Sequence, residues 1–153
     1  MEKNKQKKYP DSGVYLLKIK VAKKSKITIG ALGEKIFPVG YYFYSGTAQR
    51  NFKSRLKRHY SDDKKLYWHI DYLLQNAELE NNYVFEFTKQ GECFLTATLK
   101  SAGAKNIVKS FGASDCKCNS HLLYFNCKTG KNIVDKILKN RDLKSEFKDF
   151  LKD

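Results

Sequence analysis

The segment GVYLLKIKV at residues 13–21 is a nearly continuous run of apolar and β-branched residues, which is typical of a buried β-strand. A second short strand is predicted at 26–30, and the aromatic run YYFYSG at 41–46 predicts a third. Glycines and a proline between residues 30 and 40 indicate a loop or hairpin between the last two strands. The first part of the chain therefore predicts an antiparallel β-structure.

Helical and strand patterns alternate after residue 46. In the segment 49–60, Phe52, Leu56 and Tyr60 recur every four positions and predict one amphipathic helix. Further elements are predicted as a helix at 67–76, a strand at 83–88, a helix at 91–103, a strand at 121–126 and one or two amphipathic helices after residue 131. This order predicts an α+β fold, in which a small, mainly antiparallel sheet is flanked by helices.

A chain of 153 residues has the usual size of one domain. We expect a disordered basic lead at 1–11, a main domain at 12–127 and a helical extension at 128–153 that packs on the same domain. The sequence contains no run of about 18 apolar residues, and its polar N-terminal stretch lacks the apolar segment of a secretory signal. We therefore expect a cytoplasmic protein without a membrane partner.

The charge of the chain is strongly positive. Thirty Lys and Arg residues face 16 Asp and Glu residues, which leaves a formal net charge of +14. A lysine-rich surface composition is one explanation, but acidic residues do not rise in step with lysine here. Attraction to phosphate groups therefore favours nucleic acid as the partner.

Two predicted helices place charged side chains beside an apolar stripe. At 100° per residue, Arg55 and His59 border the stripe of the 49–60 helix, whereas Arg50, Lys53 and Lys57 lie on the far side. A structural ion pair or a loop hydrogen bond explains such an Arg and His pair as readily as a phosphate does. Glu92 borders the apolar stripe of the 91–103 helix. Either a favourable helix-dipole interaction or a metal ligand accounts for this carboxylate.

Taken together, these pieces resemble the GIY-YIG nuclease family. Gly13-Val14-Tyr15 on the first strand, Tyr44-Ser45-Gly46 on a neighbouring strand, Arg55 with His59 on the next helix and Glu92 on a later helix follow the order of the family pattern. The strings WHIDYLL and SDCKCNSHL are similar to one branch of the family, found in archaea and some bacteria. The resemblance extends to about residue 127.

The resemblance implies metal-dependent hydrolysis of phosphodiester bonds, in DNA rather than RNA. Structured or damaged DNA is a possible substrate, and DNA repair a possible role. Glu92 would hold one Mg²⁺ or Mn²⁺ ion, and Arg55 would stabilise charge on the phosphate. Tyr15 or Tyr44 would help to deprotonate the attacking water, and His59 would bond the phosphate or orient Tyr15. Further contacts to nucleic acid are expected from Gly46, Arg50, Lys53, Lys57 and Arg58.

Two features depart from the family pattern. Tyr44 follows Tyr15 by 29 residues, so an inserted strand and loop at about 22–40 must be accommodated. Ser45 stands where the family has a branched apolar residue, and a small residue there is expected to loosen strand packing. A non-catalytic DNA- or RNA-binding module of the same fold is therefore the alternative to a nuclease, and an RNA-associated basic protein is a third interpretation.

A cluster of possible zinc ligands lies near the end of the main domain. Cys116, Cys118, His121 and Cys127 are residue types that zinc accepts, but C-x-C is tighter than the usual spacing of a zinc knuckle. Buried thiols beside a hydrogen-bonded histidine explain the cluster equally simply. We expect this second explanation to hold and a zinc ion to be absent.

Overall fold

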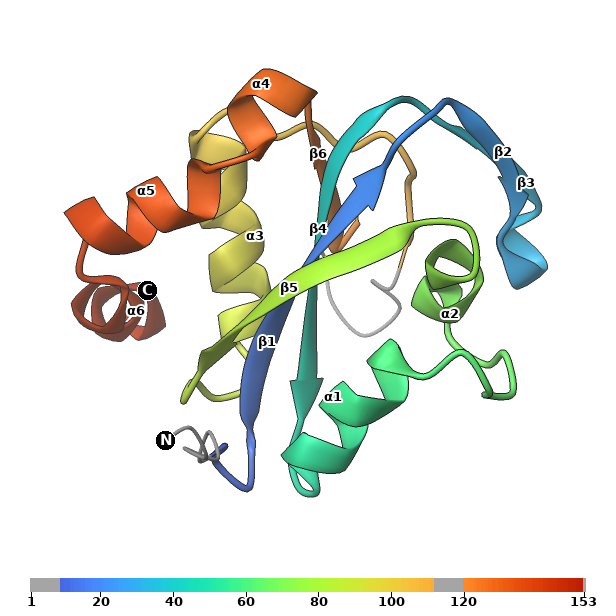
Figure 1. Ribbon diagram of the computed structural model, residues 1–153. Helices are drawn as coiled ribbons and strands as arrows, with labels where there is room; N and C mark the ends of the chain where they lie inside the picture. Colours follow the sequence, from blue (N-terminus) through green and yellow to red (C-terminus); the bar gives the residue numbers. More distant parts are fainter. Residues whose placement is uncertain (1–8, 112–119, 153) are drawn as a thin grey trace, which may run out of the picture.

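The computed structural model describes residues 9–111 and 120–152, and its central element is a four-stranded sheet (Figure 1). The strand order is β5-β1-β4-β6, and every neighbouring pair is antiparallel. The sheet consists of β1 (Gly13–Val21), β4 (Gly40–Ala48), β5 (Glu78–Phe85) and β6 (Leu122–Phe125). The predicted α+β class, with a small antiparallel sheet and flanking helices, is confirmed.

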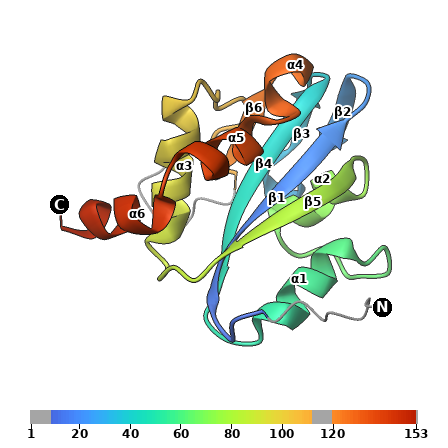
Figure 2. The same ribbon diagram turned by 60° about the vertical axis from the view of Figure 1, so that its left-hand side comes forward.

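Helices cover both faces of the sheet (Figures 1 and 2). On one face lie α1 (Phe52–Tyr60) and α2 (His69–Leu74), and on the other lie α3 (Gly91–Ser101), α5 (Ile133–Asn140) and α6 (Leu143–Leu151). The short helix α4 (Cys127–Gly130) follows β6 directly. The helices α5 and α6 agree with the one or two predicted after residue 131, whereas α4 was not predicted.

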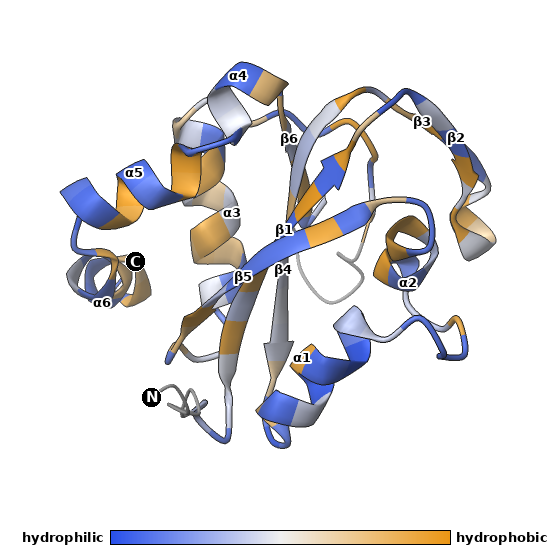
Figure 3. Cartoon of the chain, viewed as in Figure 1, coloured by the Kyte–Doolittle hydropathy of each residue, from blue (hydrophilic) through white to orange (hydrophobic). Residues whose placement is uncertain are grey.

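The central strand β1 is buried on both of its faces. Val14 and Leu16 belong to one apolar cluster, together with residues of α3, α5 and α6. Tyr15 and Leu17 belong to the opposite cluster, with residues of α1 and α2. Because alternate side chains of a strand point to opposite faces, a strand covered on both sides must be apolar at almost every position. This explains the continuous apolar run in the sequence and the orange stretches of β1 in Figure 3.

Residues 22–40 form a small unit of their own. Strands β2 (Ser25–Thr28) and β3 (Glu34–Phe37) pair as a separate two-stranded sheet, joined by the 3₁₀ helix η1 (Gly30–Leu32). Ile27, Ile29 and Phe37 are buried in the cluster that α1 and α2 cover. The inserted segment is therefore accommodated as a hairpin that extends this core, and β3 is a strand within the region predicted as a loop or hairpin.

Strand β5 begins at Glu78, five residues before the predicted start at residue 83. Its first half reads ELENN, and acidic and amide residues are uncommon in strands, so this half did not predict one. Since β5 lies at the edge of the sheet, water solvates these polar side chains without cost to the core. The sequence signal was therefore visible only in the apolar second half of the strand.

The pairing of β4 leaves one end of that strand open. On one side β1 pairs with β4 along its whole length, from Gly40 to Ala48. On the other side β6 pairs only with Tyr41 through Tyr44, followed by a single hydrogen bond from Ser45 N to the carbonyl of His121. Among the described residues, no strand covers the last part of β4 on this side. The sheet therefore offers an opening at residues 45–48.

Some expectations lie outside what the structure describes. Residues 1–8 of the expected basic lead belong to this group, as do Cys116 and Cys118. None of the helices within residues 9–111 and 120–152 combines the length and the apolar character needed to cross a membrane.

Candidate active site

Four of the five predicted site residues line one pocket beside the open end of β4. Tyr15 from β1, Tyr44 from β4, Arg55 from α1 and Glu92 from α3 all contribute to this pocket, which has a volume of about 730 Å³. Gly46 and Arg50, predicted to contact nucleic acid, line it as well. The residues that sequence reasoning did not assign to the site are Thr47, Gln49, Tyr67, Trp68, His69 and Lys89.

Tyr15 is held at the base of this pocket by Gly46 and His59. Tyr15 and Gly46 are directly opposite in the β1 and β4 pairing. A Cβ atom on Gly46 would come within 2.5 Å of Cζ of the Tyr15 ring, so only glycine lets the ring lie across the strand. The Tyr15 hydroxyl lies 2.7 Å from Nε2 of His59. The two halves of the motif, GVY and YSG, are therefore in direct contact.

Replacing Gly46 with alanine is expected to displace the Tyr15 ring and to lower the free energy of unfolding by about 1–3 kcal/mol, the usual cost of overpacking a core. The measurement is urea unfolding of the purified variants. In a Tyr15→Ala background the obstructing ring is gone, so the same glycine substitution should add little. An equal loss in both backgrounds would show that the contact with Tyr15 is not the cause.

His59 lies behind Tyr15 and is itself buried, with 2% of its surface exposed. Burial, with a further contribution from the nearby Lys64 ammonium, lowers the pKa of His59 to about 3. The imidazole is therefore neutral at physiological pH. It does not belong to the residues that line the pocket. Of the two predicted roles, orienting Tyr15 agrees with this position and bonding the phosphate does not.

Tyr60 was predicted to lie in the buried stripe of α1, with His59 at its border, and this was wrong. Tyr60 is 47% exposed, whereas Phe52, Leu56 and His59 form the buried face. Both arrangements are compatible with helical spacing, because residues at i+3 and i+4 lie on neighbouring parts of one face. The hydrogen bond from Tyr15 favours His59 on the inside.

The burial of His59 predicts a pH dependence of stability. Since the folded pKa, about 3, lies below the ordinary value of 6.5, the unfolded chain takes up the proton first as the pH falls. The contribution is fully present above pH 6.5 and is lost between there and pH 3, with a slope of up to about 1.4 kcal/mol per pH unit. Urea unfolding at several pH values should show a shallower slope for His59→Gln, which keeps a polar group near Tyr15. Equal slopes would contradict the prediction.

The two pocket tyrosines are protonated at neutral pH. Burial raises the pKa of Tyr15 well above its ordinary value, although the Arg55 charge opposes this and the Glu92 charge adds to it. Burial likewise raises the pKa of Tyr44, with smaller contributions from the charges of Tyr15 and Glu92. The nearby Arg55 charge does not suffice to make either phenol a phenolate, so a further cation would be needed before one of them could accept a proton.

Two arginines of α1 pack on the same tryptophan, but only one of them lines the pocket. The guanidinium carbons of Arg55 and Arg58 lie 4.5 and 4.4 Å from the ring centre of Trp68. Arg55 donates one hydrogen bond, of 3.1 Å, to the carbonyl of Thr47 and lines the pocket. Arg58 instead donates to both carboxylate oxygens of Asp71, at 2.8 Å each.

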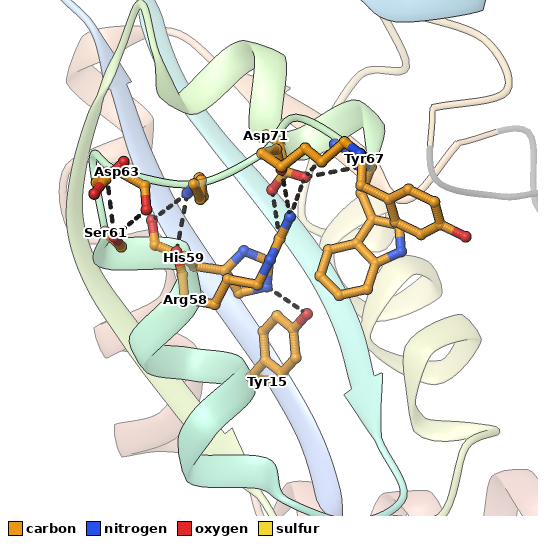
Figure 4. A network of polar contacts seen from close by, with 10 residues as sticks. Tyr15, Arg58, His59, Ser61, Asp63, Tyr67 and Asp71 are labelled. Atoms are coloured by element: carbon orange, nitrogen blue, oxygen red, sulfur yellow. Dashed lines mark hydrogen bonds and ion pairs between the residues drawn. The ribbon is translucent and has the colours of Figure 1, made fainter.

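Arg58 takes part in an internal network, which is shown in Figure 4, and its expected contact with nucleic acid stays a prediction. Asp71 is completely buried, and its Oδ2 also accepts hydrogen bonds from the backbone N–H groups of Tyr67 and Trp68. Burial alone would raise the pKa of Asp71, but these hydrogen bonds and the Arg58 charge outweigh it and lower the pKa. Asp71 lies in the first turn of α2 and caps it, whereas the helix predicted from residue 67 placed Asp71 beyond its first turn and gave no signal for this cap.

Three further basic residues were predicted to contact nucleic acid, Arg50 just before α1 and Lys53 and Lys57 on it. Arg50, Lys53 and Lys57 are exposed, as the helical wheel predicted. Of these three, Arg50 lines the pocket. Their contact with nucleic acid stays a prediction.

Glu92 lies in the first turn of α3, and its side chain is 16% exposed. Oε1 of Glu92 lies 3.6 Å from Nδ1 of the buried His121. The Glu92 carbonyl accepts a 2.9 Å hydrogen bond from Thr96, and Ser45 Oγ lies 3.4 Å from the same oxygen. Ser45 is 2% exposed and thus joins β4 to α3, instead of loosening the strand packing as expected.

The possible zinc ligands include two residues that the structure describes, His121 and Cys127, while Cys116 and Cys118 lie outside the described residues. His121 precedes β6 and lies beside Glu92, whereas Cys127 follows β6 and is exposed. The intervening strand separates them by roughly 15 Å or more at about 3.3 Å per residue, which is too far for one ion. Within residues 9–111 and 120–152, no three His, Cys, Asp or Glu residues are grouped so that they could hold a metal ion.

Comparison with known proteins places most of the chain in one family. Residues 14–142 match the family described as domain of unknown function DUF123, and the match runs past the domain boundary expected at residue 127. No curated protein and no solved structure matches the chain. The resemblance to the GIY-YIG nucleases therefore stays a prediction. The residues matched include every side chain of the candidate site, and the chain belongs to the DUF123 family.

Proposed function

We propose that this protein is a divalent-metal-dependent nuclease that hydrolyses phosphodiester bonds in DNA, as its resemblance to the GIY-YIG nucleases implies. The observation that supports the proposal is the convergence of Tyr15, Tyr44, Arg55 and Glu92 on one pocket. These residues come from two strands and two helices, β1, β4, α1 and α3, and from positions as far apart as 15 and 92. An ordinary core position does not require a carboxylate, a guanidinium and two phenols in one opening.

The pocket suits a metal that needs few protein ligands. Glu92 is the only acidic residue among the described residues that line it. Mg²⁺ is commonly held by one or two carboxylates, with water and substrate phosphate completing its shell, so a single carboxylate is compatible with one Mg²⁺ or Mn²⁺ ion. When bound, the ion would supply positive charge that polarises a phosphoryl oxygen.

The side chains that line the pocket would then act on the phosphate and on the attacking water. Arg55 is positioned by Trp68 and the Thr47 carbonyl, so its remaining N–H groups can bind a phosphate without a large loss of side-chain entropy. The Tyr15 hydroxyl, held by His59, would orient the attacking water and take part in moving its proton. Tyr44 stays the alternative for this role.

A non-catalytic nucleic-acid-binding module is the second candidate function. The high pKa values of Tyr15 and Tyr44 favour it, because a protonated phenol is a poor base. Both candidates predict binding that weakens steeply with salt, since a net charge of +14 attracts phosphate groups. Only the nuclease predicts strand cleavage.

The deciding experiment incubates the protein with linear, nicked and branched DNA, and with RNA, in the presence of Mg²⁺, Mn²⁺ or EDTA. We expect cleavage of DNA that requires the metal and falls by roughly a hundredfold or more in Arg55→Ala, the usual effect of removing a donor that stabilises transition-state charge. Tyr15→Phe should also lose cleavage. Lys139→Ala removes an exposed lysine of α5, on the other face of the sheet (Figure 1), and serves as the control that should retain cleavage. Salt-sensitive binding without cleavage under all conditions would instead support the binding module.

A further inference from the structure

The side chain of Tyr67 belongs to the lining of the pocket and is largely exposed to solvent. It is 77% exposed, the highest value among the exposed large hydrophobic residues. Its ring touches the edge of Trp68, with ring centres 5.7 Å apart and an angle of 62° between the planes. A single exposed aromatic residue needs no explanation by itself. Its place in the lining of the candidate active site does call for one.

The backbone beneath Tyr67 is fixed. Connecting loops are usually mobile, but the N–H groups of Tyr67 and Trp68 both bond the buried carboxylate of Asp71, at 2.9 and 2.8 Å. Arg58 donates a 2.9 Å hydrogen bond to the carbonyl of Lys65 in the same loop. Figure 4 shows Tyr67 projecting away from this network. The backbone from which the Tyr67 ring projects is therefore fixed before any ligand arrives.

The chemistry around this ring combines an aromatic surface with groups suited to phosphate. Arg50, Arg55 and Lys89 line the same pocket. A nucleotide has the matching parts, because its base has a flat π-face and its phosphate is anionic. Stacking of bases on aromatic side chains is the common mode by which proteins bind single-stranded nucleic acid. In an intact duplex the faces of the bases are occupied by neighbouring base pairs and are not available for such a contact.

We propose that this pocket recognises an unpaired nucleobase next to the phosphate to be cleaved, and that the base stacks on Tyr67. This inference rests on the proposed function, since it names the substrate feature that the same pocket would select. It predicts a preference for single-stranded, overhanging or flapped nucleic acid over a blunt duplex. Exposure, a fixed backbone and location in the pocket together assign this role to Tyr67 rather than to the other exposed tyrosine, Tyr60.

The test measures binding by fluorescence anisotropy in EDTA, so that no metal-dependent cleavage occurs. The probes are labelled single-stranded DNA, single-stranded RNA of the same sequence, a blunt DNA duplex and a duplex with an unpaired flap. The variants are Tyr67→Ala, Tyr67→Phe and, as the matched control, Tyr60→Ala, which removes an exposed tyrosine outside the pocket. Thermal unfolding of each variant confirms that the fold is retained, which is expected because the Tyr67 contacts with Asp71 use the backbone.

We expect Tyr67→Ala to weaken binding of the single-stranded and flapped probes by roughly tenfold, within the range known for the loss of one stacked base, and to leave duplex binding within about twofold. Tyr67→Phe keeps the ring and should bind like the unchanged protein, and so should Tyr60→Ala. A loss for single strands of DNA, RNA or both supports the inference. An equal loss for the duplex, or no loss for the single strands, would overturn it.

Failure of this inference is distinguishable from failure of the proposed nuclease. Metal-dependent cleavage with no effect of Tyr67→Ala on single-strand binding would leave the nuclease standing and remove the stacking role. A selective loss of single-strand binding without any cleavage would support the stacking role in a non-catalytic module.

Discussion

Replacing Glu92 with glutamine is expected to abolish metal-dependent cleavage while the fold and the binding of nucleic acid persist. The amide has the same shape but no charge, and Glu92 is the only acid among the described lining residues of the pocket. Loss of the ion removes several kcal/mol of charge stabilisation, which corresponds to a decrease in rate of roughly a thousandfold or more. The measurement is cleavage of labelled DNA in Mg²⁺ or Mn²⁺ at saturating protein.

The matched control for this experiment is Glu86→Gln. Glu86 is an exposed carboxylate shortly before α3 and does not line the pocket. The substitution Glu86→Gln changes the net charge by the same amount as Glu92→Gln, so any general effect of charge on DNA binding appears in both variants. Titration of Mn²⁺ into each protein should show weakened binding only for Glu92→Gln. Undiminished cleavage by Glu92→Gln would overturn the assignment of the metal ligand.

Replacing Asp71 with alanine is expected to lower the free energy of unfolding by about 3–5 kcal/mol, the cost of breaking a buried ion pair from one side. The substitution leaves the Arg58 guanidinium without its carboxylate and removes the acceptor of the Tyr67 and Trp68 N–H groups. Urea unfolding at neutral pH measures the loss. Because these groups position Trp68 and the rim of the pocket, cleavage should fall as well.

An exposed ion pair provides the control for the Asp71 experiment. Oδ1 of Asp149, on α6, lies 3.7 Å from Nζ of Lys152, which follows the helix. The Asp149 side chain is 75% exposed, so Asp149→Ala should change stability by less than about 1 kcal/mol. A second variant, Asp71→Ala combined with Arg58→Met, should recover part of the loss, since it removes the unpaired charge of Arg58, whose side chain is 28% exposed. A loss below 1 kcal/mol for Asp71→Ala alone would show that the network does not stabilise the fold.

The regular elements of the fold were predictable because their signals are local. The apolar run of β1 and the four-residue repeat of α1 follow from the geometry of strands and helices. The elements that were predicted too short or not at all have weaker signals in their local sequence. Strand β3 and the polar half of β5 are defined by their partners, and a strand is completed by hydrogen bonds that its own sequence does not encode.

The order of the candidate site residues is present in the sequence, but their convergence is not. The register of β1 and β4 places Tyr15 opposite Gly46. Strand β6 begins opposite Tyr44, which leaves the sheet open where Glu92 and Arg55 line the pocket. The Asp71 network and the exposed ring of Tyr67 were not predicted from the sequence. Both depend on how α1 and the following loop fold back on each other.

By itself the sequence determined the α+β class, the main elements and the residue types that suit phosphate chemistry. These depend on periodicity and composition, which act within a few residues. The tertiary structure decided that His59, rather than Tyr60, turns inward, that Arg58 is committed to Asp71, and that His121 lies near Glu92 instead of sharing a zinc site with Cys127. Each of these outcomes is a choice between partners distant in the chain. Burial forces a polar group to find a partner, and only the folded chain shows which partner is within reach.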